Sequence, residues 1–416
     1  MTEDGKYKVV VLSDHALSTS GVGTQTRHLL EGMLKKGCWS FRQFGAALKH
    51  SNYDTIAINK DFIIKPIDGF GDQDLIRKTL IMEKPDLIFI FTDPRFFVWL
   101  FEMEDEVHQI CPIIWWHVWD NYPYPKFNDV FYQATDQINC HSHMTYEMLK
   151  GTYPNKTAWI PHTLPPHMFY RLSENDIKQN KATLLGADRQ DDFVAIWVSR
   201  NARRKRPSDM LLAWKKFIDS QAPTGATLIM HTEPTDHEGP NLFEVVNLLG
   251  LQESVFFSRD RLEFQQMNVL YNISDVCLNT SYAEGFGLST LESMMTGTPI
   301  IAPKTGGLTK QVWDSENNRA NGVALDIQTQ TLVGNQGVPY IYEDYASVED
   351  MADALTQILN MKNNDREKYD NLSLQVEKYA KKTFNYQKMI DQWNDSMIKT
   401  IKKFKKEESK WTVETL

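Results

Sequence analysis

The stretch SYAEGFGLSTLES, residues 281–293, places Glu284 and Glu292 eight positions apart around Gly-Phe-Gly. A carboxylate only accepts hydrogen bonds, so it suits sugar hydroxyls. Glycines let backbone N–H groups meet a ligand where a helix begins, and that end of a helix favours negative charge. We predict that Glu284 enters a cleft and Glu292 lies inside the helix, one at a sugar and one at a ribose, with phosphates between. The plainer alternative is a solvated loop glutamate and a helix-capping one.

Basic residues crowd the segment that follows a second candidate strand, in WVSRNARRKRPSDMLLAW. Such a run of charge is usually a solvated face, and this holds for several of these side chains. Arg200 stands where the strand would meet a cleft, and Lys205 stands one loop further on. A rigid guanidinium fork and a mobile ammonium together suit a diphosphate.

A third candidate site is the glycine loop STSGVGTQTRHLL near the start of the chain. Gly21 and Gly23 precede a helical pattern, where free N–H groups and the helix N-terminus would favour a phosphate or a sugar. A tight turn between strand and helix is an equally good interpretation. The motif alone does not decide between them.

Two series of short apolar runs must position these residues. The first series contains candidate strands at 8–12, 54–59, 86–92, 112–118, 137–142 and 157–162, and the second at 193–199, 226–232, 254–258, 275–280, 298–303 and 322–327. Alternation of such runs with helical patterns is typical of parallel sheets covered by helices on both faces. Ligands of open α/β sheets bind at the carboxyl ends of the strands, which is where the three candidate motifs lie.

The polar stretch 171–192 separates the two series and predicts a domain junction there or just before it. We therefore expect a first Rossmann-like domain at 1–170 and a second at 171–384. The remaining chain is mostly helical by its periodicity, and a C-terminal helix at 385–405 is expected to pack back on the first domain.

Composition fits an enzyme of small molecules. The 416 residues are 42% hydrophobic and carry a net charge of -9, so no overall basic field favours nucleic acid. The scattered cysteines, with no paired spacing, indicate reduced thiols of a cytoplasmic protein. No apolar run approaches the roughly 18 to 20 residues that span a bilayer.

These motifs, together with WWHVWDN and LYNISDVCLNTSYAEGFGLSTLESMMTGTPIIAPKTGG, resemble the retaining glycosyltransferases of the GT-B fold, carbohydrate-active family 4, the glycosyl transferases group 1. The resemblance covers nearly the whole chain and includes the E-x7-E motif with its following Gly-Thr-Pro and Gly-Gly. It implies an α/β GT-B fold, with two Rossmann-like domains whose parallel sheets face a central cleft. It also implies transfer of a sugar from a nucleotide diphosphate sugar, of UDP or GDP type, to an acceptor hydroxyl with retention of configuration.

The resemblance gives each candidate residue a role. The diphosphate would be held by Arg200 and Lys205, the donor sugar by Glu284 and the ribose by Glu292. His117, at the end of IIWWHV, would be the cleft histidine near the sugar. The remaining donor-side contacts would come from backbone amides and from the glycine loop, at Phe286, Gly287, Leu288, Gly21 and Gly23.

The resemblance implies neither a metal nor another cofactor. His141/His143 and His162/His167 have a spacing that metal sites also use, but no carboxylate pattern accompanies them, and a structural role is favoured. The Asp-x-Asp-like GDQD at 71–74 reads better as a helix cap. Two other functions stay open: a GT-B nucleotide-sugar epimerase, and a non-catalytic nucleotide-sugar-binding protein.

The acceptor is unknown and could be a sugar, a lipid-linked group, a protein or a nucleic acid. The lysine-rich tail at 397–411 would permit contact with an anionic membrane surface, but a solvated helix end is favoured. The sequence departs from the family pattern in three places. Lys310 stands where a glutamate is usual, HTEPTDHEG replaces a usual glycine, and residues 326–347 lengthen a connection.

Overall fold

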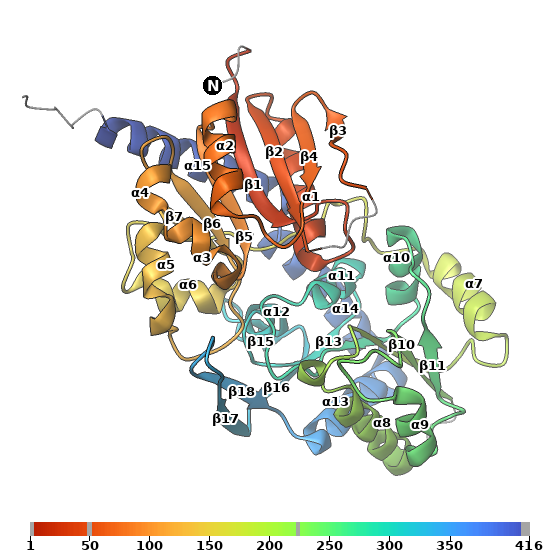
Figure 1. Cartoon of the computed structure of the whole chain (residues 1–416). Coiled ribbons are helices and arrows are strands. Elements are labelled where there is room, and N and C mark those ends of the chain that lie inside the picture. The colour runs from red at the N-terminus through yellow and green to blue at the C-terminus, as the bar shows by residue number, and fades with distance from the viewer. Residues whose placement is uncertain (1–3, 48–51, 222–224, 409–416) are drawn as a thin grey trace, which may run out of the picture.

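Two separate sheets, each covered by helices, form the computed structural model of the chain, which describes residues 4–47, 52–221 and 225–408 (Figure 1). The first sheet has the strand order β3-β4-β2-β1-β5-β6-β7-β8, and the second has the order β11-β10-β9-β12-β13-β16. All neighbours pair in parallel except β3, which runs antiparallel to β4 at the edge. The predicted fold class, two Rossmann-like α/β domains, is confirmed.

The first domain contains the strands β1 Tyr7–Asp14, β2 Trp39–Ala46, β3 Ile56–Asn59, β4 Phe62–Pro66, β5 Leu87–Thr92, β6 Ile113–His117, β7 Gln137–Cys140 and β8 Thr157–Trp159. Its helices are α1 Gly21–Leu34, α2 Gln73–Glu83, α3 Val98–Phe101, α4 Glu104–Val107, α5 Asp129–Ala134 and α6 His143–Lys150, with short 3-10 turns at Pro94–Phe97 and Lys126–Asn128. One face of the sheet packs on α2 to α6 and the other on α1.

The second domain contains β9 Phe193–Val198, β10 Ala226–His231, β11 Val255–Ser258, β12 Val276–Leu278, β13 Ile300–Pro303 and β16 Gly322–Leu325. Its helices are α7 Glu174–Leu185, α8 Pro207–Gln221, α9 Leu242–Leu249, α10 Phe264–Asn272, α11 Leu288–Thr296, α12 Leu308–Val312, α13 Val348–Asn364 and α14 Arg366–Thr383. Helices α8, α9 and α13 cover one face, and α10, α11 and α12 cover the other. Two hairpins, β14 Trp313–Asp314 with β15 Arg319–Ala320 and β17 Thr329–Val333 with β18 Ile341–Tyr345, lie outside this sheet.

The chain crosses between the domains twice. Ile160 still packs in the core of the first domain, whereas Leu164 packs in that of the second. The return follows Phe384, after which helix α15, Tyr386–Glu408, buries Trp393 against the first sheet. Figure 1 shows this blue helix lying along the first domain, so the first strand, β1, and the last helix, α15, belong to one lobe.

Several elements differ from the sequence prediction. Strands β2 and β4 were not predicted. In β2, Arg42 and Gln43 interrupt the apolar run, even though this strand lies between β1 and β4 in the sheet. The polar stretch 171–192 contains helix α7, of which only Lys181 is fully buried. The β17–β18 hairpin was also missed, since β17 is almost wholly exposed and has no buried run to reveal it.

The lysine-rich tail lies in α15, and its residues beyond 408 fall outside the described part of the chain. Met397 and Ile401 pack in the first-domain core, and Lys405 donates to Asp86 over 2.7 Å. The apolar side of this segment is therefore used in packing. Within residues 4–47, 52–221 and 225–408, no helix combines the length and apolarity that crossing a membrane requires.

Candidate active site

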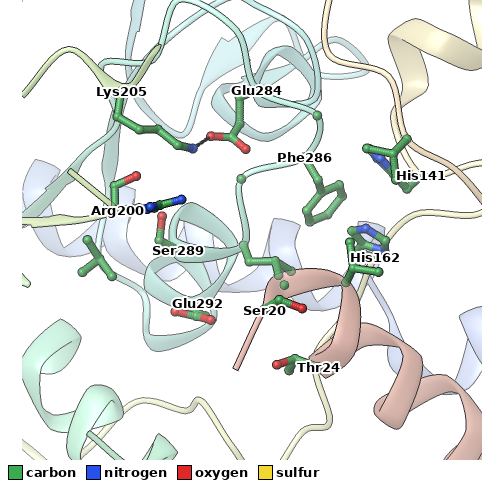
Figure 2. A pocket seen from close by; sticks show the side chains of 18 of the residues that line it. Ser20, Thr24, His141, His162, Arg200, Lys205, Glu284, Phe286, Ser289 and Glu292 are labelled. Atoms are coloured by element: carbon green, nitrogen blue, oxygen red, sulfur yellow. Dashed lines mark hydrogen bonds and ion pairs between the residues drawn. The ribbon is translucent and has the colours of Figure 1, made fainter. Parts of the chain in front are cut away.

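A cavity of about 590 Å³ lies between the two domains, where the carboxyl ends of both sheets meet. Its second-domain wall comes from the loops after β9 and β12 and from the start of α11. Its first-domain wall comes from the start of α1 and from the segments after β6, β7 and β8. Figure 2 shows side chains from both domains pointing into this space. The predicted position of the ligand site, at the strand ends, matches this cavity.

A buried ion pair dominates the second-domain wall. The Lys205 ammonium donates to the Glu284 carboxylate, and the side chains are only 11% and 12% exposed. Ser281 Oγ donates to Glu284 over 3.4 Å, and Arg204 Nη1 lies 3.6 Å from the same oxygen. Burial acts to raise the pKa of Glu284, but the two cations outweigh it and hold that pKa below its usual value. Glu284 is therefore a carboxylate with one ammonium fixed against it.

The Gly306-Gly307 pair brings the Glu284 loop to this position. Gly307 N–H donates to the Glu284 carbonyl over 2.8 Å, and a Cβ atom on Gly306 would lie 2.1 Å from that carbonyl oxygen. The two backbones touch, so neither position has room for a side chain. This close contact is the physical reason for the second glycine pair in the motif.

Gln311 orients the backbone where α11 begins. Its Nε2 donates to the carbonyls of Phe286 and Gly287 over 2.6 and 3.1 Å. In a trans peptide the N–H points opposite to the carbonyl, so the amides of Gly287 and Leu288 are directed away from Gln311. Gly287 has φ 88°, a conformation that favours glycine. Phe286, Gly287 and Leu288, the residues predicted to offer backbone amides, all line the cavity.

Glu292 lies inside α11 and lines the cavity, as its spacing predicts. Its carboxyl accepts a hydrogen bond from the Tyr271 hydroxyl over 2.7 Å. Burial raises the pKa of Glu292 to about 7, although the bond from Tyr271 opposes the shift. Glu292 therefore changes charge near neutral pH, unlike Glu284.

Arg200 lines the edge of the same cavity but is 53% exposed and already paired. Its Nε and Nη2 donate to Asp236 over 2.7 and 3.1 Å, and its Nη1 lies 3.4 Å from Glu238. The bond from Arg200 holds the pKa of Asp236 down to about 2. Both carboxylates belong to the HTEPTDHEG segment, whose departure from the family pattern the sequence already showed. An anionic ligand would have to bind Arg200 alongside these two carboxylates or displace them from it.

The start of α1 forms the lower part of the first-domain wall (Figure 2). Ser20 caps the helix by accepting from Gly23 N–H over 3.0 Å. Gly21 lines the cavity, and a Cβ atom there would lie 3.2 Å from Leu288 Cδ1 of the second domain. Gly23 does not line the cavity. It packs against the preceding loop, where a Cβ atom on Gly23 would lie 2.1 Å from Ser18 Oγ. The two helix N-termini therefore face one cavity, and Gly21 is the exposed glycine of the pair.

His117 does not reach the cavity wall, contrary to the role expected for it. Its side chain is fully buried, and its Nε2 lies 2.8 Å from the Tyr132 hydroxyl. Side chains alternate along a strand, so His117 shares the face of Trp115, which α5 covers. Burial holds the pKa of His117 well below its usual value.

His141 and His162 occupy the first-domain wall instead. Their rings stack with centroids 4.6 Å apart, and each meets the Phe286 ring edge-on. Burial lowers the pKa of His141 to about 3, so it is neutral at ordinary pH. Within the described part of the chain, no three His, Cys, Asp or Glu side chains are grouped so that they could hold a metal ion.

Asp120, which the sequence analysis did not single out, also lines the cavity from the first domain. It follows β6 by three residues, and that position at the end of a strand predicted within 112–118 was the signal that could have revealed it. Lys310 lies outside the cavity, with its Nζ 3.1 Å from Ser315 Oγ and above the Trp159 ring. Its neighbour Gln311 is the residue that reaches the start of α11, through the Phe286 and Gly287 carbonyls.

Solved structures share the fold of this chain. The HepE protein of Anabaena, solved with UDP and glucose, superposes with a TM-score of 0.68 at 16% identity and covers 94% of this chain and 100% of its own. Sucrose-phosphate synthase from Thermosynechococcus elongatus superposes with a TM-score of 0.70 at 17% identity and covers 94% and 98%. The chain therefore has the GT-B fold of these glycosyltransferases.

The sequence of the second domain matches a known family. Residues 186–382 match the model of the family "Glycosyl transferases group 1". A D-inositol 3-phosphate glycosyltransferase of Corynebacterium diphtheriae is 30% identical over 32% of this chain and 30% of its own length. An alpha-1,3/1,6-mannosyltransferase of Yarrowia lipolytica is 25% identical over 47% and 48%. The matched region thus spans less than half of either relative.

Proposed function

We propose that this protein transfers a sugar from a nucleotide diphosphate sugar to an acceptor hydroxyl, with retention of configuration and without a metal. The observation that carries the proposal is the second-domain wall, where Lys205, Glu284 and the start of α11 converge on one cavity. The family match of this domain supports the reaction class. The HepE protein was solved with UDP and with UDP-glucose, which supports a donor of this chemical type.

The donor fits along this wall in a definite order. Glu292 takes the ribose hydroxyls, and the diphosphate lies over the α11 N-terminus, which favours negative charge. Lys205 and Arg200 stand at the two sides of the diphosphate. Glu284 accepts hydrogen bonds from the sugar to be transferred, while Lys205 keeps it ionised.

The reaction breaks the bond between the anomeric carbon and the β-phosphate oxygen, and the electron pair stays on the departing diphosphate. Preorganised cations and amides in a partly dehydrated site stabilise such charge without further reorganisation. Lys205, Arg200 and the amides that Gln311 orients supply them. The acceptor oxygen then attacks the face that the diphosphate leaves, which preserves the anomeric configuration.

Incubation with a panel of nucleotide sugars tests this function against the alternatives. A transferase releases nucleotide diphosphate, slowly with water and faster when an acceptor such as a free sugar or inositol phosphate is present. An epimerase yields a new epimer without release, and a binding protein saturates without turnover. Addition of EDTA is expected to leave the rate unchanged. Loss of activity in EDTA that Mg²⁺ or Mn²⁺ restores would contradict the metal-independent mechanism.

A further inference from the structure

Asp120 is a carboxylate on the cavity wall with no partner of its own. It lies in the loop between β6 and the turn at Lys126–Asn128 and is partly exposed to the cavity. Among the described residues, no hydrogen bond or ion pair to its carboxylate is found. Glu284, by comparison, is paired with Lys205 and flanked by Arg204. Of the three carboxyl groups on the cavity wall, Glu284 is thus paired with cations and Glu292 accepts from Tyr271, whereas Asp120 has no such partner among the described residues.

The free carboxylate faces the paired one across the domain boundary. A Cβ atom on Gly285 would lie 2.4 Å from Asp120 Oδ1 and 3.1 Å from His141 Cε1. Asp120 thus overhangs the peptide that follows Glu284, the residue assigned to the donor sugar. A group held by Asp120 would lie beside that sugar, on the side of the first domain.

The second domain fixes the backbone around Asp120. Tyr342 N–H in β18 donates to the Tyr122 carbonyl over 2.7 Å, and Asn121 Nδ2 donates to the Tyr342 carbonyl over 2.6 Å. The Asp120 carbonyl lies 2.8 Å from where a Gly306 Cβ atom would be. The β17–β18 hairpin therefore holds the Asp120 loop from the opposite domain, in addition to Thr145 of the first domain, which donates to the Trp119 carbonyl over 3.2 Å.

We propose that Asp120 binds the acceptor hydroxyl and takes its proton during transfer. This inference rests on the proposed function and names a residue for its acceptor side. The acceptor oxygen forms the bond to the anomeric carbon, its proton passes to Asp120, and the electron pair of the broken bond leaves with the diphosphate. An ionised carboxylate accepts a hydroxyl proton but repels an anionic group, so the reacting end of the acceptor is a neutral hydroxyl.

The surroundings of Asp120 suit a base. Burial raises the pKa of its carboxyl, Arg204 and Lys205 oppose the shift, and Glu284 and Asp93 add to it. His141, the other titratable group against this position, is neutral. A carboxyl with a raised pKa is a better proton acceptor near neutral pH than an ordinary aspartate.

The test compares wild type with Asp120→Asn, using UDP-glucose and GDP-mannose as donors and water as the acceptor. Because a general base contributes at least about 100-fold, Asp120→Asn should slow release of nucleotide diphosphate by about that factor. Its affinity for UDP or GDP, measured by calorimetry, should not change. Asp105→Asn makes the same substitution at an exposed position of α4 and should leave both quantities unchanged. Asp120→Glu, which keeps a carboxylate, should recover part of the rate.

Each other outcome is decisive. An Asp120→Asn enzyme that releases nucleotide diphosphate at the wild-type rate overturns the inference and leaves the proposed function intact. Weakened binding of UDP or GDP, or a sugar covalently attached to Asp120 in the intact-protein mass spectrum, would also overturn it. If wild type neither binds nor cleaves any nucleotide sugar, the proposed function fails first and takes this inference with it.

Discussion

The two walls of the cavity are built in opposite ways. The second-domain wall is charged and internally paired, with Lys205 on Glu284 and Arg200 on Asp236. The first-domain wall is mostly neutral, with stacked imidazole rings and one unpaired carboxylate, Asp120. The charged wall resembles a binding site whose counter-charges are already in place. In the described part of the chain, the first-domain wall leaves the Asp120 carboxylate and the Nδ1 atoms of His141 and His162 without a hydrogen-bond partner.

Under the proposed function, this difference assigns one half of the reaction to each domain. A diphosphate needs fixed positive charge, and only the second-domain wall supplies it beside a helix N-terminus. A neutral hydroxyl needs an acceptor and an otherwise uncharged surface, as the first-domain wall provides. Substitutions that affect one wall and spare the other test this assignment.

The largest effect is expected from Lys205→Ala on the charged wall. Loss of one charged contact to the departing group costs about 100-fold in rate. The fold should also weaken, because breaking the buried pair leaves Glu284 with only Arg204, at 3.6 Å, as a counter-charge, at a cost of up to about 3 kcal/mol in the free energy of unfolding.

A paired variant separates stability from chemistry. Lys205→Met combined with Glu284→Gln removes both charges and should recover much of the melting temperature without recovering turnover. Recovery of turnover together with stability would mean that the ion pair serves the fold alone, and the donor assignment of this wall would be wrong.

Gly285→Ala should have the next largest effect, and on the opposite wall. The added methyl group meets Asp120 Oδ1 at 2.4 Å, so Asp120 must move. Displacement of a reacting group by about 1 Å can cost up to about 100-fold in rate. Transfer should fall while UDP or GDP affinity persists. Parallel loss of nucleotide affinity would show that the two walls are not functionally separate.

Glu292 should make nucleotide binding depend on pH. As the pH falls below about 7, its carboxyl takes up a proton and ceases to be a full acceptor for the ribose hydroxyls. Affinity for the nucleotide diphosphate should therefore weaken from pH 8 to pH 6, by at most about tenfold per pH unit. Glu292→Gln should remove this dependence, which calorimetry at several pH values can measure.

The same group should affect stability in the other direction. Its folded-state pKa of about 7 lies above the ordinary 4.5, so the folded protein binds the proton more tightly than the unfolded chain. The free energy of unfolding should then fall as the pH rises from about 4.5 to about 7, and Glu292→Gln should abolish that part of the decline. A flat difference between the two proteins over this range would contradict the raised pKa of Glu292.

The smallest effect is expected at the edge of the charged wall. Asp236→Asn frees Arg200 from its bidentate partner, leaving Glu238 at 3.4 Å. Because an exposed pair of this kind is worth at most about 1 kcal/mol, affinity for UDP or GDP should rise about fivefold or less. Weaker binding would indicate that Asp236 orients Arg200 for the phosphate and does not compete with it.

The sequence revealed the charged wall because its residues lie close together along the chain. Glu284, Gly287 and Glu292 belong to one loop and helix, and their spacing alone implies a common site. Lys205 follows a strand that the apolar pattern predicts. Local spacing is what a single sequence reports best.

The neutral wall could not be predicted in the same way. Asp120, His141 and His162 follow three different strands, and no spacing connects them. His117 was expected on this wall, but its side chain is buried on the other face of β6, against Tyr132 of α5. In the β17–β18 hairpin that holds the Asp120 loop, β17 is almost wholly exposed and the buried residues of β18 are the charged Glu343 and Asp344, so the hydrophobic pattern could not reveal it. Tertiary contacts that leave no periodic signal account for each of these misses.

The most direct test of the central claim, that the second-domain wall holds the diphosphate of a nucleotide sugar, is a calorimetric titration. UDP, GDP and ADP are titrated into wild type and into the Lys205→Met/Glu284→Gln variant. The corresponding nucleosides are titrated separately as controls. One diphosphate should bind wild type at least about 100-fold more tightly than its nucleoside, a difference of about 2.7 kcal/mol, and most of that difference should vanish in the variant. Equal affinities for diphosphate and nucleoside in wild type, or a difference that survives intact in the variant, would contradict the account.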